Sequence, residues 1–157
     1  MGILLYVDNS NVWIEAMYVA AVAAGDAPDI HTAHQFNIMR PYILDFGRLH
    51  EFAGGSTSEV TRAVLYGSQP PKSDSLWRAA REQGFEVVVY DRKSRNKEKK
   101  VDTKIVTDMI TESFTLANEG DQFTLVAGDS DYIPVLEQIR VVVFPSTLSS
   151  GATPPWN

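Results

Sequence analysis

The feature that most constrains this chain is a series of short apolar runs, each separated from the next by a helix-length segment. The runs are ILLYV at 3–7, VTRAVLY at 60–66, FEVVVY at 85–90, QFTLVA at 122–127 and VVVF at 141–144. Apolar, β-branched runs of this length predict strands buried on both faces, and their alternation with helices is typical of parallel βαβ units. We therefore expect an α/β domain, built as a three-layer sandwich with a mainly parallel sheet.

Helices are expected between these strands. The segments with helical spacing are 11–24, 36–53, 73–83, 101–116 and 132–140, and residues 91–100 are interpreted as a charged loop. The last helix runs into the strand at 141–144 with no turn residue, although such connections usually need about 2–6 residues. Either this helix ends earlier or residues are missing at Arg140–Val141. Residues 145–157 are rich in Pro, Ser, Gly and Thr and predict an irregular tail after a domain of residues 1–144.

Composition narrows the class of protein. A chain of 157 residues with 44% hydrophobic content suits one domain with its own core. The absence of cysteine excludes a disulfide scaffold, a cysteine-ligated zinc site and a thiol nucleophile. No apolar stretch is long enough to span a bilayer. We therefore expect a soluble, cytoplasmic domain.

Aspartates follow two of the predicted strands. Asp8 comes directly after ILLYV, and Asp129 and Asp131 follow TLVAG. Ligands of open parallel sheets bind outside the carboxyl ends of the strands. Several carboxylates that converge there either raise one another's pKa or bind a cation. Ligand sets made of oxygen alone favour hard divalent ions such as Mg²⁺ or Mn²⁺.

Helix capping is the competing interpretation of these aspartates. Asp129 or Asp131 is placed to cap the helix that begins near residue 132. Asp8 has less need of this role, because residues 9–11 already offer three capping side chains. Asn11 is expected either to cap the helix or to orient Asp8.

Two further acids belong to the segment KKVDTKIVTD at 99–108. Asp102 lies near a helix start, where the helix dipole favours a carboxylate in any protein. Asp108 lies two turns beyond Val101, close to the apolar stripe of the same helix. A carboxylate there is costly unless it faces a polar site, so Asp108 is harder to explain as a structural residue.

Three of these motifs together resemble a known family. They are VDNSN at 7–11, KKVDTKIVTD at 99–108 and LVAGDSDYIPVLEQIR at 125–140, and VLYGS and GFEVVVYD between them are also similar to it. The family is the NYN domain, in the LabA-like branch of the PIN-like nucleases. The resemblance covers Ile3 to Phe144 and implies a PIN-like Rossmannoid fold with metal-dependent ribonuclease activity.

The resemblance also implies a site. Its catalytic residues would be Asp8, Asn11, Asp102, Asp108, Asp129 and Asp131, and its metal ligands the same set without Asn11, holding Mg²⁺ or Mn²⁺. Two departures stand out, and neither removes an acid. Ala127 replaces a small polar residue of the last motif, and no Gly-containing turn precedes the last strand. The second departure favours missing residues as the explanation of the Arg140–Val141 connection.

Basic charge is concentrated in one segment. Residues 92–100 carry a net charge of +5 in a chain of net charge −6, so the remainder carries −11. The six basic residues are Arg92, Lys93, Arg95, Lys97, Lys99 and Lys100. The segment is either a solvated loop or a phosphate-binding segment, and its place between a strand end and Asp102 favours phosphate contacts. Five aromatic side chains would either stack on bases or fill the core: Tyr6, Trp13, Tyr66, Trp77 and Tyr132.

We therefore predict a ribonuclease with RNA as its partner. The alternative is a non-catalytic RNA-binding or adaptor module that keeps the fold. A phosphotransfer or receiver-like domain fits less well, because it needs a lysine near a later strand, whereas Lys104 is placed on a helix and Lys72 follows Pro71. A homodimer and a regulatory protein partner both remain open, and no membrane association is expected.

Overall fold

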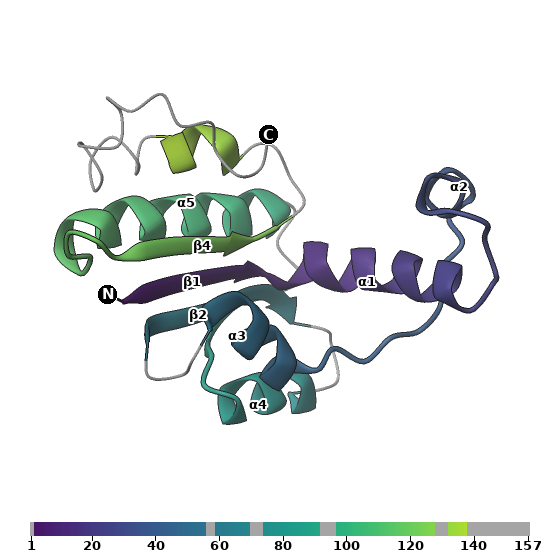
Figure 1. The fold of residues 1–157 in the computed structure, drawn as a ribbon, viewed down its shortest axis with the longest axis horizontal. Helices are drawn as coiled ribbons and strands as arrows, with labels where there is room; N and C mark the ends of the chain where they lie inside the picture. The colour runs from purple at the N-terminus through teal and green to yellow at the C-terminus, as the bar shows by residue number, and fades with distance from the viewer. Residues whose placement is uncertain (1, 56–58, 70–73, 92–96, 128–131, 138–157) are drawn as a thin grey trace.

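The computed structural model of the chain describes residues 2–55, 59–69, 74–91, 97–127 and 132–137. The strands are β1 (Ile3–Asp8), β2 (Val60–Gln69), β3 (Glu86–Asp91) and β4 (Gln122–Val126). They form one sheet in the order β3-β2-β1-β4, and every neighbouring pair is parallel (Figure 1). The α/β class and the parallel sheet predicted from the apolar runs are confirmed.

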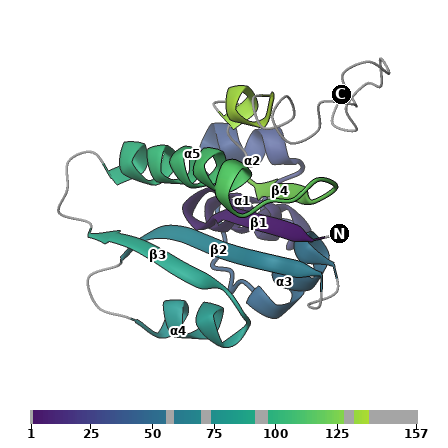
Figure 2. The same cartoon turned by 90° about the vertical axis from the view of Figure 1, so that its left-hand side faces the viewer.

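Helices cover both faces of this sheet. The helices of the domain are α1 (Asn9–Ala23), α2 (Ile30–Phe36), α3 (Phe46–Gly54), α4 (Ser75–Glu82) and α5 (Lys97–Thr115), and residues 132–137 add a short helical segment. Figures 1 and 2 show α5 and that segment on one side of the sheet and α3 and α4 on the other. The domain therefore has the three layers that the sequence pattern indicates.

The alternation of side chains along β1 explains the three layers. Successive residues of a strand point to opposite faces. Leu4 and Tyr6 pack in the cluster that contains Ile105 and Met109 of α5, whereas Leu5 and Val7 pack in the cluster that contains residues of α3 and α4. Because both faces of β1 are covered, all six of its residues are buried.

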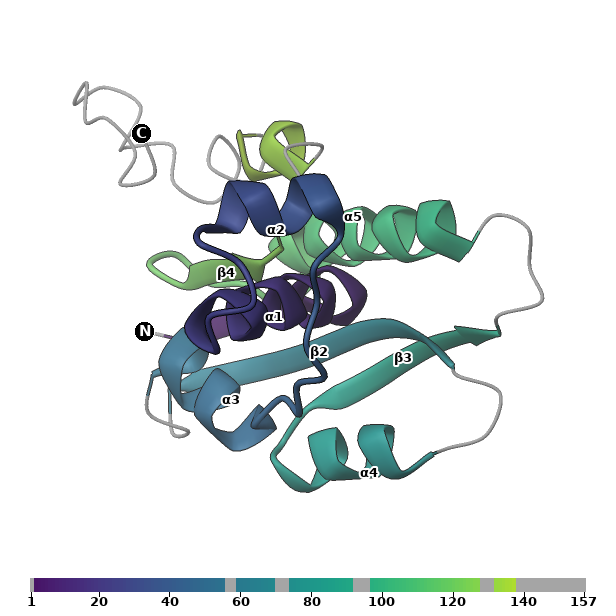
Figure 3. The same ribbon diagram turned by 90° about the vertical axis from the view of Figure 1, so that its right-hand side faces the viewer.

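The chain between β1 and α3 differs from the prediction. We expected one amphipathic helix over 36–53, but α2 ends at Phe36 and α3 begins only at Phe46. Asn37 adopts a left-handed conformation (φ 52°) that ends α2, and the Asp45 side chain accepts the Arg48 N–H and caps α3. Pro41, in the segment between them, has no N–H to donate to a helix. Figure 1 shows that α1 and α2 extend beyond the carboxyl end of β1, and Figure 3, seen from that side, shows them in front of the sheet.

Other boundaries shift by smaller amounts. The predicted loop at 91–100 is wrong in its last part, because α5 begins at Lys97. The predicted strand 141–144, the Arg140–Val141 connection and the tail 145–157 lie outside the described residues, so the division into a domain and a tail stays a prediction. Within the described part of the chain, no helix is both long and apolar enough to cross a membrane.

Asp121 links the chain before β1 to the turn before β4 through hydrogen bonds. Its carboxylate accepts the backbone N–H groups of Gly2 at 2.8 Å and Asn118 at 2.9 Å. These two bonds, that from Asn118 first, lower the pKa of Asp121. A carboxyl whose pKa is lowered in the folded state stabilises the protein above its unfolded pKa, and this contribution is lost as the pH falls through the folded value.

We expect Asp121→Asn to lower the free energy of unfolding by about 1–2 kcal/mol at neutral pH, the scale of hydrogen bonds to a charged group. The difference should narrow as the pH falls below the usual range of an aspartate, because the wild-type carboxyl then loses its charge as well. Urea unfolding at neutral pH and at that lower pH measures this. Glu119→Gln, an exposed acid of the same turn, is the control. A loss for Asp121→Asn that does not change with pH would contradict the assignment.

Candidate functional site

The strand order creates a natural site at one edge of the sheet. From β1 the chain adds β2 and β3 on one side, and then returns to place β4 on the other side of β1. Val7 is therefore paired with Leu65 of β2 and with Val126 of β4. Parallel sheets bind ligands outside the carboxyl ends of the strands at such a reversal point. Asp8, the last residue of β1, lies there.

Asp8 makes structural contacts at this position. It is 6% exposed, and its Oδ1 accepts the backbone N–H of Asn11 at 3.3 Å, so Asp8 is the N-cap of α1. We expected residues 9–11 to supply the cap, and this was wrong, since α1 already begins at Asn9. Its other oxygen, Oδ2, accepts a hydrogen bond from the Tyr132 hydroxyl at 3.2 Å.

The same hydroxyl reaches a second acid. Tyr132 donates to Oδ1 of Asp102, near the start of α5, at 2.8 Å. The two carboxylate oxygens are therefore within about 6 Å of each other, and we call Asp8 and Asp102 the acid pair. Two negative charges at that separation repel by about 3 kcal/mol at an effective dielectric constant of about 20. Burial, followed by the bond to Asp102, raises the pKa of the Tyr132 hydroxyl, which therefore remains a donor.

Asp108 lies six residues further along α5 than Asp102 and has its own partners. Its Oδ2 accepts the Tyr66 hydroxyl at 2.7 Å, and its Oδ1 accepts from the Lys104 ammonium at 2.7 Å. The bond to Asp108 raises the pKa of Lys104, which therefore keeps its charge throughout the neutral range. The polar surroundings that the sequence required for a carboxylate on the apolar stripe are thus a lysine one turn away and a tyrosine from β2.

Glu112 continues this arrangement and was missed by the sequence analysis. It accepts the Tyr6 hydroxyl and forms an ion pair with Arg62 at 2.7 Å. Burial is the main cause that raises the pKa of Glu112, and the bonds to Tyr6 and Arg62 oppose it. Its spacing was the available signal, because Glu112 follows Asp108 by four residues and therefore lies on the same helix face.

The structure describes three of the five predicted acids and places them in two groups. Asp8 and Asp102 meet at Tyr132, Asp108 is held by Tyr66 and Lys104, and Asp129 and Asp131 lie outside the described residues. Among the residues with described side chains, no three Asp, Glu or His form a group that could hold a metal ion. β4 ends beside β1, and residues 129 and 131 follow it in the chain, so the metal site stays a prediction that depends on them.

The basic segment is described only in part. Lys97, Lys99 and Lys100 belong to the first turn of α5, and the Lys100 side chain is exposed. The other three basic residues of the prediction, Arg92, Lys93 and Arg95, lie outside the described residues. The helix that carries Asp102 therefore begins with lysines.

The five aromatic candidates separate clearly by exposure. Four of them, Tyr6, Tyr66, Trp77 and Tyr132, are buried and serve the core or the acids of α5. Trp13 is 40% exposed, and its indole N–H donates to the carbonyl of Tyr42 at 3.1 Å. It lies on α1, five residues after Asp8. Of the five, Trp13 is thus the one that a base is able to reach.

A hollow of about 560 Å³ lies elsewhere on the described surface. Its lining includes Val60 and Thr61 at the start of β2, Glu86 at the start of β3, and His50. These positions mark the edge of the sheet opposite to Asp8. Because the ligand-binding edge of a parallel sheet is the carboxyl one, the hollow has no part in the site built here.

Comparison with known protein families matches the NYN domain over residues 6–143. The matched region contains Asp8, both acids of α5 that the sequence singled out, and the segment after β4. No curated protein and no solved structure gives a significant match.

We expect Lys104→Met to lower the free energy of unfolding by about 1–2 kcal/mol, because Asp108 is buried and loses its cation. The raised pKa of Lys104 means that this contribution is lost only as the pH rises through the folded pKa, above the usual lysine range. Chemical denaturation across the neutral range should therefore show a constant difference from wild type. Lys100→Met, at an exposed lysine of the same helix, is the control. Equal effects of the two substitutions would contradict a specific role for the ion pair.

Proposed function

Because the chain belongs to the NYN domain family, whose members are generally ribonuclease-like, we propose that it hydrolyses RNA phosphodiester bonds with the help of Mg²⁺ or Mn²⁺. The observation that carries the proposal is the acid pair. Two carboxylates from distant parts of the chain converge at the carboxyl edge of the sheet, where its strand order reverses. Helix capping explains the contact between Asp8 and Asn11, but it does not explain why Asp8 and Asp102 both lie beside the Tyr132 hydroxyl.

The donor set suits a hard divalent ion. Carboxylate oxygens are the ligands that Mg²⁺ and Mn²⁺ prefer, and the chain has no cysteine to favour a softer metal. When bound, such an ion activates water for attack on the phosphate and stabilises the negative charge that develops there. Hydrolysis adds the oxygen of water to phosphorus and breaks one P–O ester bond.

We assign the acids different roles. Asp8, Asp108 and Asp129 are the proposed metal ligands, and Asp102 and Asp131 complete the outer coordination or orient water. Asp8 supports this assignment by its place at the end of β1. Asp108 would have to exchange the Lys104 ammonium for the metal ion, because that positive charge already lies 2.7 Å from its Oδ1. Asn11 contributes by holding Asp8 through its backbone N–H.

We place RNA along the start of α5 and α1. The proposed phosphate contacts are Arg92, Lys93, Arg95, Lys97, Lys99 and Lys100. Phosphate contacts of this kind supply affinity without reading sequence. The positive N-terminus of α5 adds a favourable field for phosphate at the same end of the helix. The negative charge of the remaining chain then serves to keep the backbone of RNA away from other surfaces.

A non-catalytic RNA-binding module is the second candidate, and the Asp108–Lys104 ion pair favours it. A lysine that already neutralises a proposed ligand weakens the case for a cation at that position. Titration with Mn²⁺ distinguishes the two functions. RNA binding without any Mn²⁺ binding would support the adaptor function and contradict the nuclease.

We expect purified protein to cleave RNA with Mn²⁺ and to stop when EDTA removes the ion. Asp8→Asn should lower the cleavage rate at least about 100-fold, because a neutral amide binds a divalent ion poorly where charge develops in the transition state. Asn still accepts the Asn11 N–H, so α1 keeps its cap. The measurement is the rate of cleavage of a labelled RNA under single-turnover conditions.

Glu15→Gln is the matched control for this experiment. Glu15 is also an acid of the α1 region, but it pairs with His34 on the surface. The Glu15→Gln variant should cleave RNA at the wild-type rate. Asp129→Asn tests the undescribed part of the site in the same assay and should lose as much activity as Asp8→Asn. Cleavage that survives in both aspartate variants would rule out the proposed site.

We expect Trp13→Ala to weaken the binding of single-stranded RNA. A base stacked on an aromatic ring contributes about 1–3 kcal/mol, which corresponds to about 5- to 150-fold in Kd. The rise of a helix places Trp13 about 7–8 Å along the axis of α1 from Asp8, in the part of α1 that begins at the proposed site. Fluorescence anisotropy with a short RNA measures the Kd.

Two further variants make this test specific. Trp13→Phe should retain most of the affinity, because a phenyl ring still offers a face for stacking. Ile43→Ala removes a highly exposed apolar side chain from the segment that follows α2 and should leave the Kd unchanged. Equal weakening by Trp13→Ala and Ile43→Ala would indicate general apolar contact and not stacking.

A further inference from the structure

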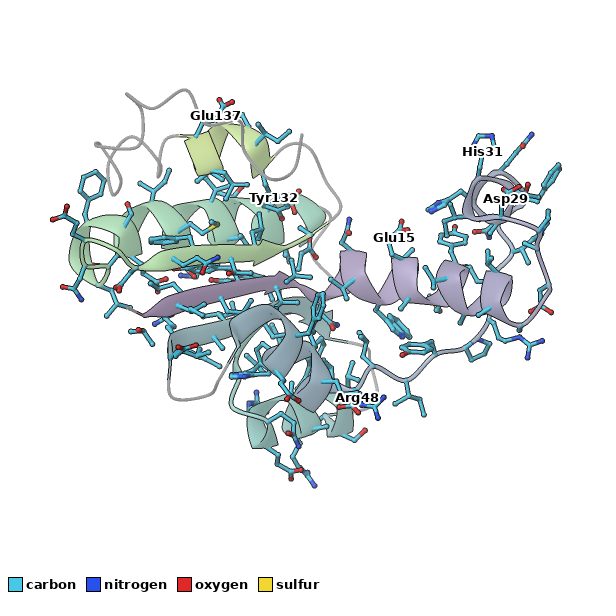
Figure 4. The ribbon with its side chains drawn as sticks, viewed as in Figure 1. Glu15, Asp29, His31, Arg48, Tyr132 and Glu137 are labelled. Atoms are coloured by element: carbon cyan, nitrogen blue, oxygen red, sulfur yellow. The ribbon has the colours of Figure 1, made fainter. Side chains whose placement is uncertain are left out.

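Tyr132 is the side chain that joins the two members of the acid pair. It begins the helical segment 132–137, lies beside the end of α5 that is nearest to α1 (Figure 4), and is 2% exposed. Its ring belongs to the core cluster that contains Val101 and Ile105 of α5. Packing therefore fixes the ring, and the position of the hydroxyl follows from it.

A phenol hydroxyl has one proton, so it donates to one carboxylate at a time. The Asp102 oxygen at 2.8 Å is the nearer acceptor, and the Asp8 oxygen at 3.2 Å is the farther one. Asp8 accepts the Asn11 N–H at Oδ1, and the Tyr132 hydroxyl lies within hydrogen-bond distance of its Oδ2. A carboxylate oxygen has two lone pairs, so accepting a hydrogen bond does not by itself prevent it from binding a cation.

We propose that Tyr132 is a positioning residue of the site, whose hydroxyl orients Asp8 and Asp102 for a divalent cation. This inference rests on the proposed function and adds a residue to it. Tyr132 touches neither the RNA nor the ion. It acts by fixing the planes of two carboxylates that belong to different elements, β1 and α5. Partners that orient metal ligands in this way typically affect metal affinity by 10- to 100-fold.

The chain offers a closely matched control. Tyr6 is also buried in the core cluster next to α5, and its hydroxyl also donates to a carboxylate of that helix, Glu112. Glu112 is not among the proposed ligands. Tyr→Phe at either position removes one oxygen from a buried ring without changing its shape. A purely structural role therefore predicts the same behaviour for both variants.

The experiment compares Tyr132→Phe and Tyr6→Phe with wild type in Mn²⁺ binding without RNA, by isothermal titration calorimetry, and in thermal unfolding without metal. Both variants should have a lower Tm, since each removes one hydrogen bond from a carboxylate of the α5 region. Tyr132→Phe should weaken Mn²⁺ binding by about 10- to 100-fold. Tyr6→Phe should retain the wild-type Kd. In RNA cleavage at saturating Mn²⁺, Tyr132→Phe should lower kcat and leave KM unchanged.

The outcomes separate this inference from the proposed function. Unchanged or tighter Mn²⁺ binding by Tyr132→Phe overturns the inference alone, provided that wild type binds Mn²⁺ and cleaves RNA. Equal weakening by the two variants also overturns it, because the effect would then report general loosening of α5. Failure of the wild-type chain to bind Mn²⁺ overturns both the inference and the proposed function.

Discussion

The burial of β1 between β2 and β4 is the constraint on which the rest of the structure depends. Its residues are covered by strands on both edges and by helices on both faces. A strand in that position carries Asp8 at its end into a buried setting, where an unpartnered carboxylate would be costly. The fold therefore requires donors around Asp8, and the first residues of α1 and the segment 132–137 provide them.

Three acids of α5 need a hydrogen-bond donor, and a tyrosine hydroxyl supplies it each time. Asp102, Asp108 and Glu112 each accept a tyrosine hydroxyl, and the tyrosines come from three different elements. Each phenol ring fills the core while its oxygen satisfies an acid, so one residue type supplies both apolar area and a hydrogen bond. Asp108 and Glu112 also have a basic partner, Lys104 and Arg62. In the acid pair, by contrast, Asp8 and Asp102 share the single hydroxyl of Tyr132.

The architecture could be predicted from local patterns, whereas the partners of the acids could not. The alternation of ILLYV with polar turns and helices indicates a parallel sheet, and Asn37, Pro41 and Asp45 were visible signals for the break between α2 and α3. The neighbours of β1 were not predictable in this way, since pairing depends on residues far apart in the chain. For the same reason, the sequence shows that Tyr66 and Tyr132 have rings that could fill a core, but it does not show which carboxylate accepts each hydroxyl.

The donors that stabilise the acids affect how metal binding is related to folding. Asp108 has a lysine and Asp102 has a hydroxyl, so these groups are stabilised by the chain itself. A divalent ion at this edge would then add stability by mass action, as any ligand of the native state does. It would also have to compete with donors that are already in place, which lowers its affinity relative to an unpaired acid cluster. This competition is strongest at Asp108, where the ion would have to displace the Lys104 ammonium.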